Sequence, residues 1–166
     1  MFRRADTVWL VLDSTQPIDL EPIRRNAGTD ISDVSATALP KGQAIRFRLT
    51  RPQLASLAGG VTNDNSGASS DSGKSWTLTF ADTLKASSQP LVARRNVNDV
   101  KRANITIPLA RPGAVRRITD PDAGDTLLVV TALPPAQGFI KRQDFVELSV
   151  LESIQECRRS ANRWCP

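Results

Sequence analysis

The chain of 166 residues contains no histidine and no tyrosine. Without histidine, the sequence excludes Ser-His-Asp and Cys-His catalysis, a histidine general base and every histidine-containing metal site. Carboxylate chemistry, a Ser-Lys pair or binding without chemistry would still be possible. The chain has only four glutamates and no local pattern of paired carboxylates. We therefore expect a protein that is not an enzyme, with no catalytic residues, no cofactor and no metal.

Cysteine is also scarce, and long apolar runs are missing. Cys157 and Cys165 are the only two cysteines, and two thiols cannot complete a zinc site. The sequence leaves open whether they pair with each other. No run approaches the eighteen or so apolar residues of a membrane-spanning helix. The apolar run at Val8–Leu12 is short and has aspartates on both flanks, so it is not typical of a signal peptide.

The charge balance is basic. Lysine and arginine number 22 against 17 acidic residues, which gives a formal net charge of +5. Arginine predominates, and its guanidinium group can bind carboxylate or phosphate through two parallel hydrogen bonds. Basic pairs recur along the chain, from Arg3-Arg4 to Arg158-Arg159. Adjacent side chains of a strand point to opposite faces, however, so a pair does not by itself create a basic patch.

The apolar residues that are present follow a strand-like pattern. In residues 44–50, Ile45, Phe47 and Leu49 alternate with Arg46 and Arg48. Period-two alternation is typical of a strand with one buried face. Similar apolar or alternating runs occupy residues 7–13, 75–81, 104–110, 125–133 and 145–151, separated by turns rich in Pro and Gly. The sequence predicts a mainly β fold, an antiparallel sandwich-like arrangement with little helix and two related β units.

Helix signals are few. Residues 18–28 predict a short helix ended by Gly28, and residues 51–60 predict another ended by two glycines. Between the β runs, residues 59–73 consist mainly of Gly, Ser, Asn and Asp, and predict a flexible linker loop. We expect a first β unit over residues 1–58, this linker over 59–73, a second β unit over 74–155 and an irregular tail over 156–166.

Two short motifs resemble ligand-binding loops but fail on spacing. In the first, the glycines Gly67 and Gly73 are separated by one residue more than in a phosphate-binding loop. A phosphate-binding loop is also followed by a helix, whereas a strand pattern follows Gly73-Lys74-Ser75. The segment "DPDAGD" at residues 120–125 lacks the Gly and Glu positions of a calcium-binding EF-hand loop. Pro121 and Gly124 instead predict a turn before the next strand.

Several strand runs carry a family resemblance. The segments "FRRADTVWLVLDSTQPIDL", "DPDAGDTLLVVTALPP" and "QDFVELSVLESIQ" together resemble the β-rich region of large bacterial envelope proteins that also carry tetratricopeptide-like helical repeats. The opening "TVWLVLDSTQPIDL" followed by "AIRFRL" is similar to an AMIN domain, a small β-sandwich module that binds peptidoglycan or other envelope partners. The resemblance implies a periplasmic or envelope-associated location within a longer chain. A cytoplasmic location stays open.

Together these features predict a binding or scaffolding domain of a bacterial cell-envelope protein, whose partner is an envelope polymer or another protein. If the partner is anionic, Arg46 and Arg48 are the candidate binding residues, on a solvent face opposite Ile45, Phe47 and Leu49. The same two arginines could instead serve only to keep that face soluble. The alternative function is a basic module that binds anions or nucleic acid through the basic pairs. The sequence leaves the partner and the oligomeric state open.

Overall fold

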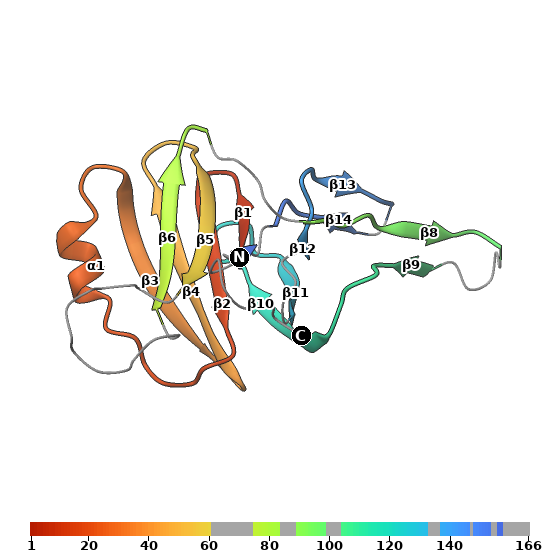
Figure 1. Ribbon diagram of the computed structural model, residues 1–166, viewed down its shortest axis with the longest axis horizontal. Coiled ribbons are helices and arrows are strands. Elements are labelled where there is room, and N and C mark those ends of the chain that lie inside the picture. Colours follow the sequence, from red (N-terminus) through yellow and green to blue (C-terminus); the bar gives the residue numbers. More distant parts are fainter. Residues whose placement is uncertain are drawn as a thin grey trace.

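The computed structural model describes residues 1–60, 75–83, 89–98, 104–132, 137–146, 148–153 and 156–157. Figure 1 shows that strands predominate. Among the described residues the helix is α1 (Glu21–Asn26). The longer strands are β2 (Thr7–Leu12), β3 (Ile31–Leu39), β4 (Gly42–Leu49), β5 (Leu54–Gly60), β6 (Ser75–Ala81), β10 (Pro112–Thr119) and β11 (Thr126–Ala132). The shorter strands are β1 (Phe2–Arg4), β7 (Gln89–Pro90), β8 (Arg94–Asn96), β9 (Asn104–Thr106), β12 (Gln137–Gly138), β13 (Gln143–Asp144), β14 (Ser149–Val150) and β15 (Glu156–Cys157).

The central element is a four-stranded sheet in the order β1-β2-β4-β3, with every pairing antiparallel. Its strands come from the first fifty residues. The other sheets have two or three strands each: β5 pairs antiparallel with β6, and β10 pairs antiparallel with β11. The fold is therefore mainly β, and its longer strands pair antiparallel, as the sequence predicted, while β12 with β7 and β15 with β5 form short parallel pairs.

One face of the four-stranded sheet carries the larger apolar core. Ile45, Phe47 and Leu49 of β4 are buried there, at most 3% exposed, beside Val8 and Val34 from the neighbouring strands. The β5–β6 hairpin covers this face with Ala55 and Leu57 of β5 and Leu78 and Phe80 of β6. The alternation predicted for residues 44–50 is confirmed on this face.

The opposite face of the same sheet is covered by the β10–β11 hairpin. Trp9, Val11 and Ala44 are buried there with Ile118 of β10. Leu127 and Val129 of β11 pack against the same cluster. The Phe2 and Trp9 rings are stacked, with centroids 6.0 Å apart. Because both faces are covered, six of the eight residues of β4 and five of the six residues of β2 are buried.

Several expectations about individual elements can be compared with the structure. Helix α1 lies inside the helix predicted over residues 18–28, and Gly28 has a φ of +59° beyond its end. The helix predicted over residues 51–60 is wrong, because Leu54–Gly60 forms β5, where residues 54–57 alternate between half-buried and buried positions. Strand β3 was not predicted, since its residues 32–38 are mainly small or polar.

At the predicted boundaries between the β units, the linker and the tail, the structure has paired strands. Gly59 and Gly60, at the start of the predicted linker, belong to β5, and the remaining linker residues 61–73 lie outside the described residues. Strand β6, from the predicted second unit, pairs along the whole of β5. In the predicted tail, Glu156–Cys157 pairs in parallel with β5, and residues 158–166 lie outside the described residues.

The tight turn between β3 and β4 gives a test of how closely β4 packs against β2. Gly42 has a φ of +146°, and a Cβ atom added there would lie 2.2 Å from the backbone oxygen of Leu12. We expect Gly42→Ala to lower the free energy of unfolding by about 2 to 4 kcal/mol, because backbone strain adds to the steric clash. Gly28→Ala, at a positive φ with open space around it, is the control and should cost about 1 kcal/mol. Urea unfolding of both variants measures the difference, and equal losses would contradict this account.

Candidate functional site

The candidate arginines lie on the second face of the sheet, the one that the β10–β11 hairpin covers. Arg46 pairs in register with Trp9 of β2 and Ser35 of β3, and Arg48 pairs with Thr7 of β2. Both point away from the core formed by Ile45 and its neighbours, as predicted. The expectation of a solvent face is wrong for Arg46, whose side chain is only 13% exposed, and holds in part for Arg48, at 41%.

Both arginines bind the same carboxylate. Asp122, in the turn between β10 and β11, accepts a hydrogen bond from Arg46 and pairs with Arg48 at 2.5 Å. The guanidinium of Arg46 also lies over the ring of Trp9, 5.8 Å from its centroid. Arg48 and Arg46 hold the pKa of the Asp122 carboxyl below its ordinary value through their hydrogen bonds. The predicted binding residues thus have an internal anionic partner.

A third arginine binds the other two aspartates of the same turn. Arg4, at the end of β1, donates from Nη1 to Asp120 at 2.9 Å and to Asp125 at 2.5 Å, and from Nη2 to Asp125 at 2.8 Å. Its hydrogen bond lowers the pKa of Asp125 below the ordinary value. Asp120 is buried, with 6% of its side chain exposed. Each aspartate of "DPDAGD" is therefore paired with an arginine of the sheet; we call this group the turn cluster (Arg4, Arg46, Arg48, Asp120, Asp122 and Asp125).

The turn that carries these aspartates is the one predicted from the sequence. The Gly124 backbone N–H donates to the backbone oxygen of Asp120, and the Asp122 backbone N–H donates to the Asp120 carboxylate. Gly124 has a φ of +70°, a conformation that glycine adopts without steric cost. Because Asp120 fixes the turn and also binds Arg4, it links the shape of the hairpin to its attachment on the sheet.

The opposite end of the hairpin is attached in the same manner. Arg116 of β10 pairs with Asp13 at 2.6 Å and donates to the backbone oxygen of Lys41. Thr131 of β11 donates its hydroxyl hydrogen to Asp13 at 3.1 Å. The side chain of Arg116 is only 9% exposed. Charged contacts thus hold both ends of the β10–β11 hairpin, with the apolar contacts around Trp9 and Ile118 between them.

An open hollow of about 660 Å³ adjoins the turn cluster. Three arginines line it, Arg3, Arg4 and Arg142. Arg3 pairs with Glu152 at 3.0 Å, Arg4 belongs to the turn cluster, and Arg142 pairs with Asp144 at 2.7 Å. Each arginine of the hollow therefore has a carboxylate partner. The hollow contains no concentration of unpaired positive charge.

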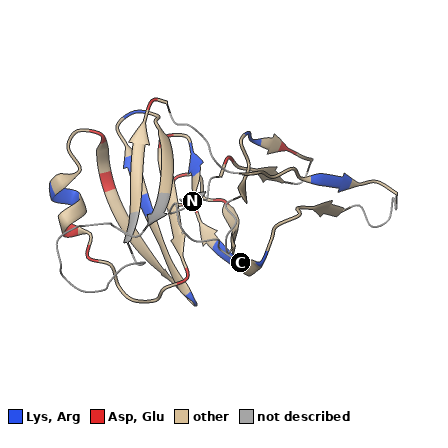
Figure 2. Ribbon diagram, viewed as in Figure 1, with Lys and Arg blue, Asp and Glu red and all other residues tan. Residues whose placement is uncertain are grey.

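The remaining basic pairs are distributed over the fold. Arg24-Arg25 lies in α1, Arg94-Arg95 in β8 and Arg116-Arg117 in β10. Figure 2 shows basic and acidic segments interspersed along the described ribbon. Lys101-Arg102 and Arg158-Arg159 lie outside the described residues. Within the described ranges, no group of three cysteine or acidic side chains is placed to hold a metal ion.

Comparison with known proteins yields no relative: no family model, no curated protein and no solved structure matches the chain. The chain can therefore be described only by its class: it is a mainly β domain in which the arginines of the four-stranded sheet form ion pairs with carboxylates of the same chain. In the described ranges, no helix is long and apolar enough to cross a membrane.

Sequence reasoning found Arg46 and Arg48 but missed their partners. Arg4 and Asp125 are 121 positions apart in the chain, and Arg46 and Asp122 are 76 apart. One signal was available, because three aspartates in six residues are an unusual density for a chain with a basic balance. Nothing local in the sequence indicates which arginines they meet.

The burial of Asp120 leads to a stability prediction. We expect Asp120→Ala to lower the free energy of unfolding by about 2 kcal/mol, because it removes a charged hydrogen bond in a half-buried setting and a bond that fixes the turn. Asp82→Ala is the matched control: Asp82 also pairs with an arginine, Arg51, but its side chain is 66% exposed. Its removal should change stability little. Urea unfolding compares the two variants, and equal effects would contradict a structural role for the turn cluster.

The same cluster predicts a loss of stability in acid. Asp122 and Asp125 have folded-state pKa values lowered from the ordinary 3.8, so their contribution is complete above that value and is lost as the pH falls through the lowered pKa values. We expect the melting temperature to fall as the pH drops below about 4. The double variant Asp122→Asn with Asp125→Asn should melt lower at neutral pH and show a shallower fall in acid. Parallel pH profiles for the two proteins would exclude these carboxylates as the cause.

Proposed function

We propose that this chain is a non-enzymatic binding or scaffolding domain of a bacterial cell-envelope protein, located in the periplasm or on the envelope as part of a longer chain. The proposal rests on the resemblance carried by the strand runs of the sequence and on the way charge and apolar surface are divided in the structure. Its AMIN-like and envelope-related character comes from the sequence resemblance alone.

The division of apolar surface is the observation that carries the proposal. Among the described residues, nine of the ten exposed large hydrophobic side chains lie within residues 92–148, the part of the chain whose strands form two-stranded sheets. On the outer face of the β10–β11 hairpin, Val115 and Leu128 are each 62% exposed, and Val130 is 40% exposed. Val115 and Val130 are direct cross-strand neighbours. A contiguous exposed apolar group of this kind favours contact with another protein surface.

The internal ion pairs argue against an anionic polymer at the predicted arginines. Arg4, Arg46 and Arg48 are already paired with carboxylates of the turn cluster. A polyanion would have to displace those carboxylates, which also hold the hairpin in place. We therefore favour a protein partner over an anionic polymer.

The alternative, a basic anion- or nucleic-acid-binding module, has one observation in its favour. Arg94 and Arg95 on β8 are both exposed, and Figure 1 shows the β8–β9 ribbon extending away from the four-stranded sheet. Two exposed arginines on a projecting ribbon are accessible to a polyanion. The experiment below separates this alternative from the envelope proposal.

The test is co-sedimentation of the purified chain with peptidoglycan sacculi, either as isolated with their bound proteins or after protease treatment, and parallel binding to heparin and DNA over a salt series. We expect retention on the untreated sacculi that survives moderate salt, since apolar contacts are little screened. Loss of retention after protease treatment would identify a protein partner, and retention on both preparations would identify the polymer.

Two double variants serve as matched controls, both at exposed positions. Val115→Ser with Leu128→Ser should abolish retention on sacculi, and Arg94→Ser with Arg95→Ser should leave it unchanged. Binding to heparin or DNA alone, steeply reduced by salt and lost in the arginine double variant, would establish the alternative instead. No retention on either sacculus preparation would contradict the proposal.

A further inference from the structure

The β8–β9 ribbon carries positive charge that has no carboxylate partner within the described ranges. Residues 89–98 and 104–111 contain three arginines and no acidic residue. Arg94 and Arg95 of β8 are exposed, and in the described part of the chain neither side chain forms an ion pair or a hydrogen bond. The arginines of the turn cluster, by contrast, are all paired with aspartates. The charge of the ribbon is therefore available to a ligand.

The register of the two strands places four polar side chains on the same face of the ribbon. Residues directly opposite each other share a face, and so do residues two apart on one strand. The opposite face carries Arg95 and its partner Ile105, which is half-buried. The four polar residues are all exposed, and we call them the polar ribbon face: Arg94 with its partner Thr106, and Asn96 with its partner Asn104.

The polar ribbon face offers mainly hydrogen-bond donors. A guanidinium group has five N–H donors and no acceptor, so Arg94 can only donate. The side-chain oxygen of Asn96 already accepts a bond from the backbone N–H of Asn98, at 3.1 Å. The two amide N–H donors of Asn96 are then the groups that this side chain can offer to a ligand. Donors of this kind, beside a positive charge, are best satisfied by the oxygens of an anion.

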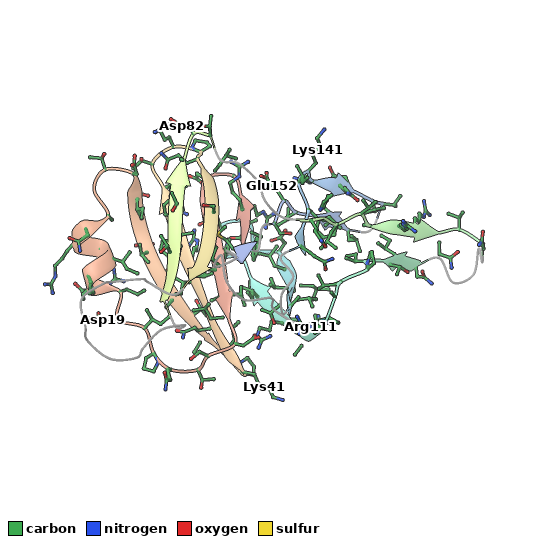
Figure 3. All side chains as sticks on the ribbon, in the orientation of Figure 1. Asp19, Lys41, Asp82, Arg111, Lys141 and Glu152 are labelled. Carbon is green, nitrogen blue, oxygen red and sulfur yellow. The ribbon has the colours of Figure 1, made fainter. Side chains whose placement is uncertain are left out.

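The position of the ribbon suits contact with a long polymer. Figure 1 shows β8 and β9 extending away from the four-stranded sheet, and Figure 2 shows β8 in the blue of basic residues at this projecting end. Figure 3 shows side chains extending outward from this part of the ribbon. Two residues along each strand span about 7 Å, so a polymer places only one or two of its charged groups on the polar ribbon face at a time.

We propose that the polar ribbon face binds the backbone of a phosphodiester polymer. Arg94 binds the oxygens of one phosphate through two parallel hydrogen bonds, and Asn96 and Thr106 donate to neighbouring oxygens. Contacts of this kind hold a polymer without reading its sequence. Nucleic acids and the glycerol phosphate polymers of bacterial cell walls both present this group. The site lies on a different sheet from the apolar face of the β10–β11 hairpin, so it does not rest on the function proposed above.

Fluorescence anisotropy of a labelled thymidine oligonucleotide tests the site on the whole chain. We expect binding at low salt that weakens steeply as salt is added, with similar affinity for an adenosine oligonucleotide, because the contacts are to phosphate. Displacement by an unlabelled glycerol phosphate polymer supports the shared phosphodiester chemistry, and the two dissociation constants show which source binds more tightly. Absence of binding to either polymer at low salt overturns the proposal, and so does binding that depends on the base sequence.

Arg94→Ser and Arg95→Ser form a matched pair, because they remove the same charge from neighbouring residues on opposite faces of the ribbon. Arg94→Ser should raise the dissociation constant roughly tenfold. It should also reduce the slope of the logarithm of the binding constant against the logarithm of salt concentration by about 0.7, the value for one phosphate contact with a single strand. Arg95→Ser should have a much smaller effect, since this residue acts only through screened charge. Equal effects would mean general electrostatic attraction and overturn the proposal.

Two further variants test the face without removing Arg94. Asn96→Asp keeps the acceptor for the Asn98 backbone N–H but puts a carboxylate on the polar ribbon face, and should weaken binding at least as much as Arg94→Ser. Arg117→Ser, at an exposed arginine of β10, is the control and should leave binding nearly unchanged. If Arg117→Ser weakens binding as much as Arg94→Ser, the polymer lies elsewhere and the proposal is wrong. Circular dichroism checks that each variant keeps its fold. Retention on sacculi, which is assigned to the β10–β11 hairpin, is measured separately, so either proposal can fail without the other.

Discussion

Strand β4 has to be covered on both faces, and the arrangement of the other elements follows from this requirement. Ile45, Phe47 and Leu49 require an apolar cover on one side, which the β5–β6 hairpin provides. Ala44 lies beside Trp9 and Val11 on the other side, where the β10–β11 hairpin packs. Two hairpins from distant parts of the chain thus meet a sheet built from its first fifty residues. The arginines that alternate with the apolar residues of β4 then lie beneath the second hairpin, where burial of an unpaired guanidinium would be costly.

The turn cluster offsets that cost by placing carboxylates beside the arginines. Asp122 neutralises Arg46 and Arg48, while Asp120 and Asp125 neutralise Arg4. Arginine suits this setting because its planar group bonds a carboxylate and lies over an aromatic ring at the same time, as Arg46 does with Asp122 and Trp9. A basic composition therefore does not produce a basic binding face in this region. Exposed positive charge lies instead at positions such as Arg94 and Arg95 on the β8–β9 ribbon.

The sequence predicted those parts of the fold in which the local residue pattern matches the secondary structure and burial that the residues have in the folded chain. The alternation at residues 44–50, the turn at residues 120–125 and the helix before Gly28 are local signals, and the structure contains all three. Strand β5 was mistaken for a helix because Leu54–Gly60 is rich in alanine and leucine, and only its pairing with β6 makes it a strand. The burial of Arg46 could not be predicted, because Asp122, in the turn that covers it, lies 76 positions later in the chain. Contacts of that range leave no local trace in a single sequence.

The long separation between the sheet and its second cover has a consequence for synthesis on the ribosome. The strands that carry Trp9, Val11 and Ala44 are complete by residue 49, but Ile118 and Val129, which cover them, are added much later. At typical rates of translation, the interval is of the order of ten seconds. During that time an apolar face of the nascent sheet is available to chaperones or to other chains. Of the two apolar faces of the sheet, this one stays uncovered longer, since the β5–β6 hairpin that covers the other is complete at residue 81.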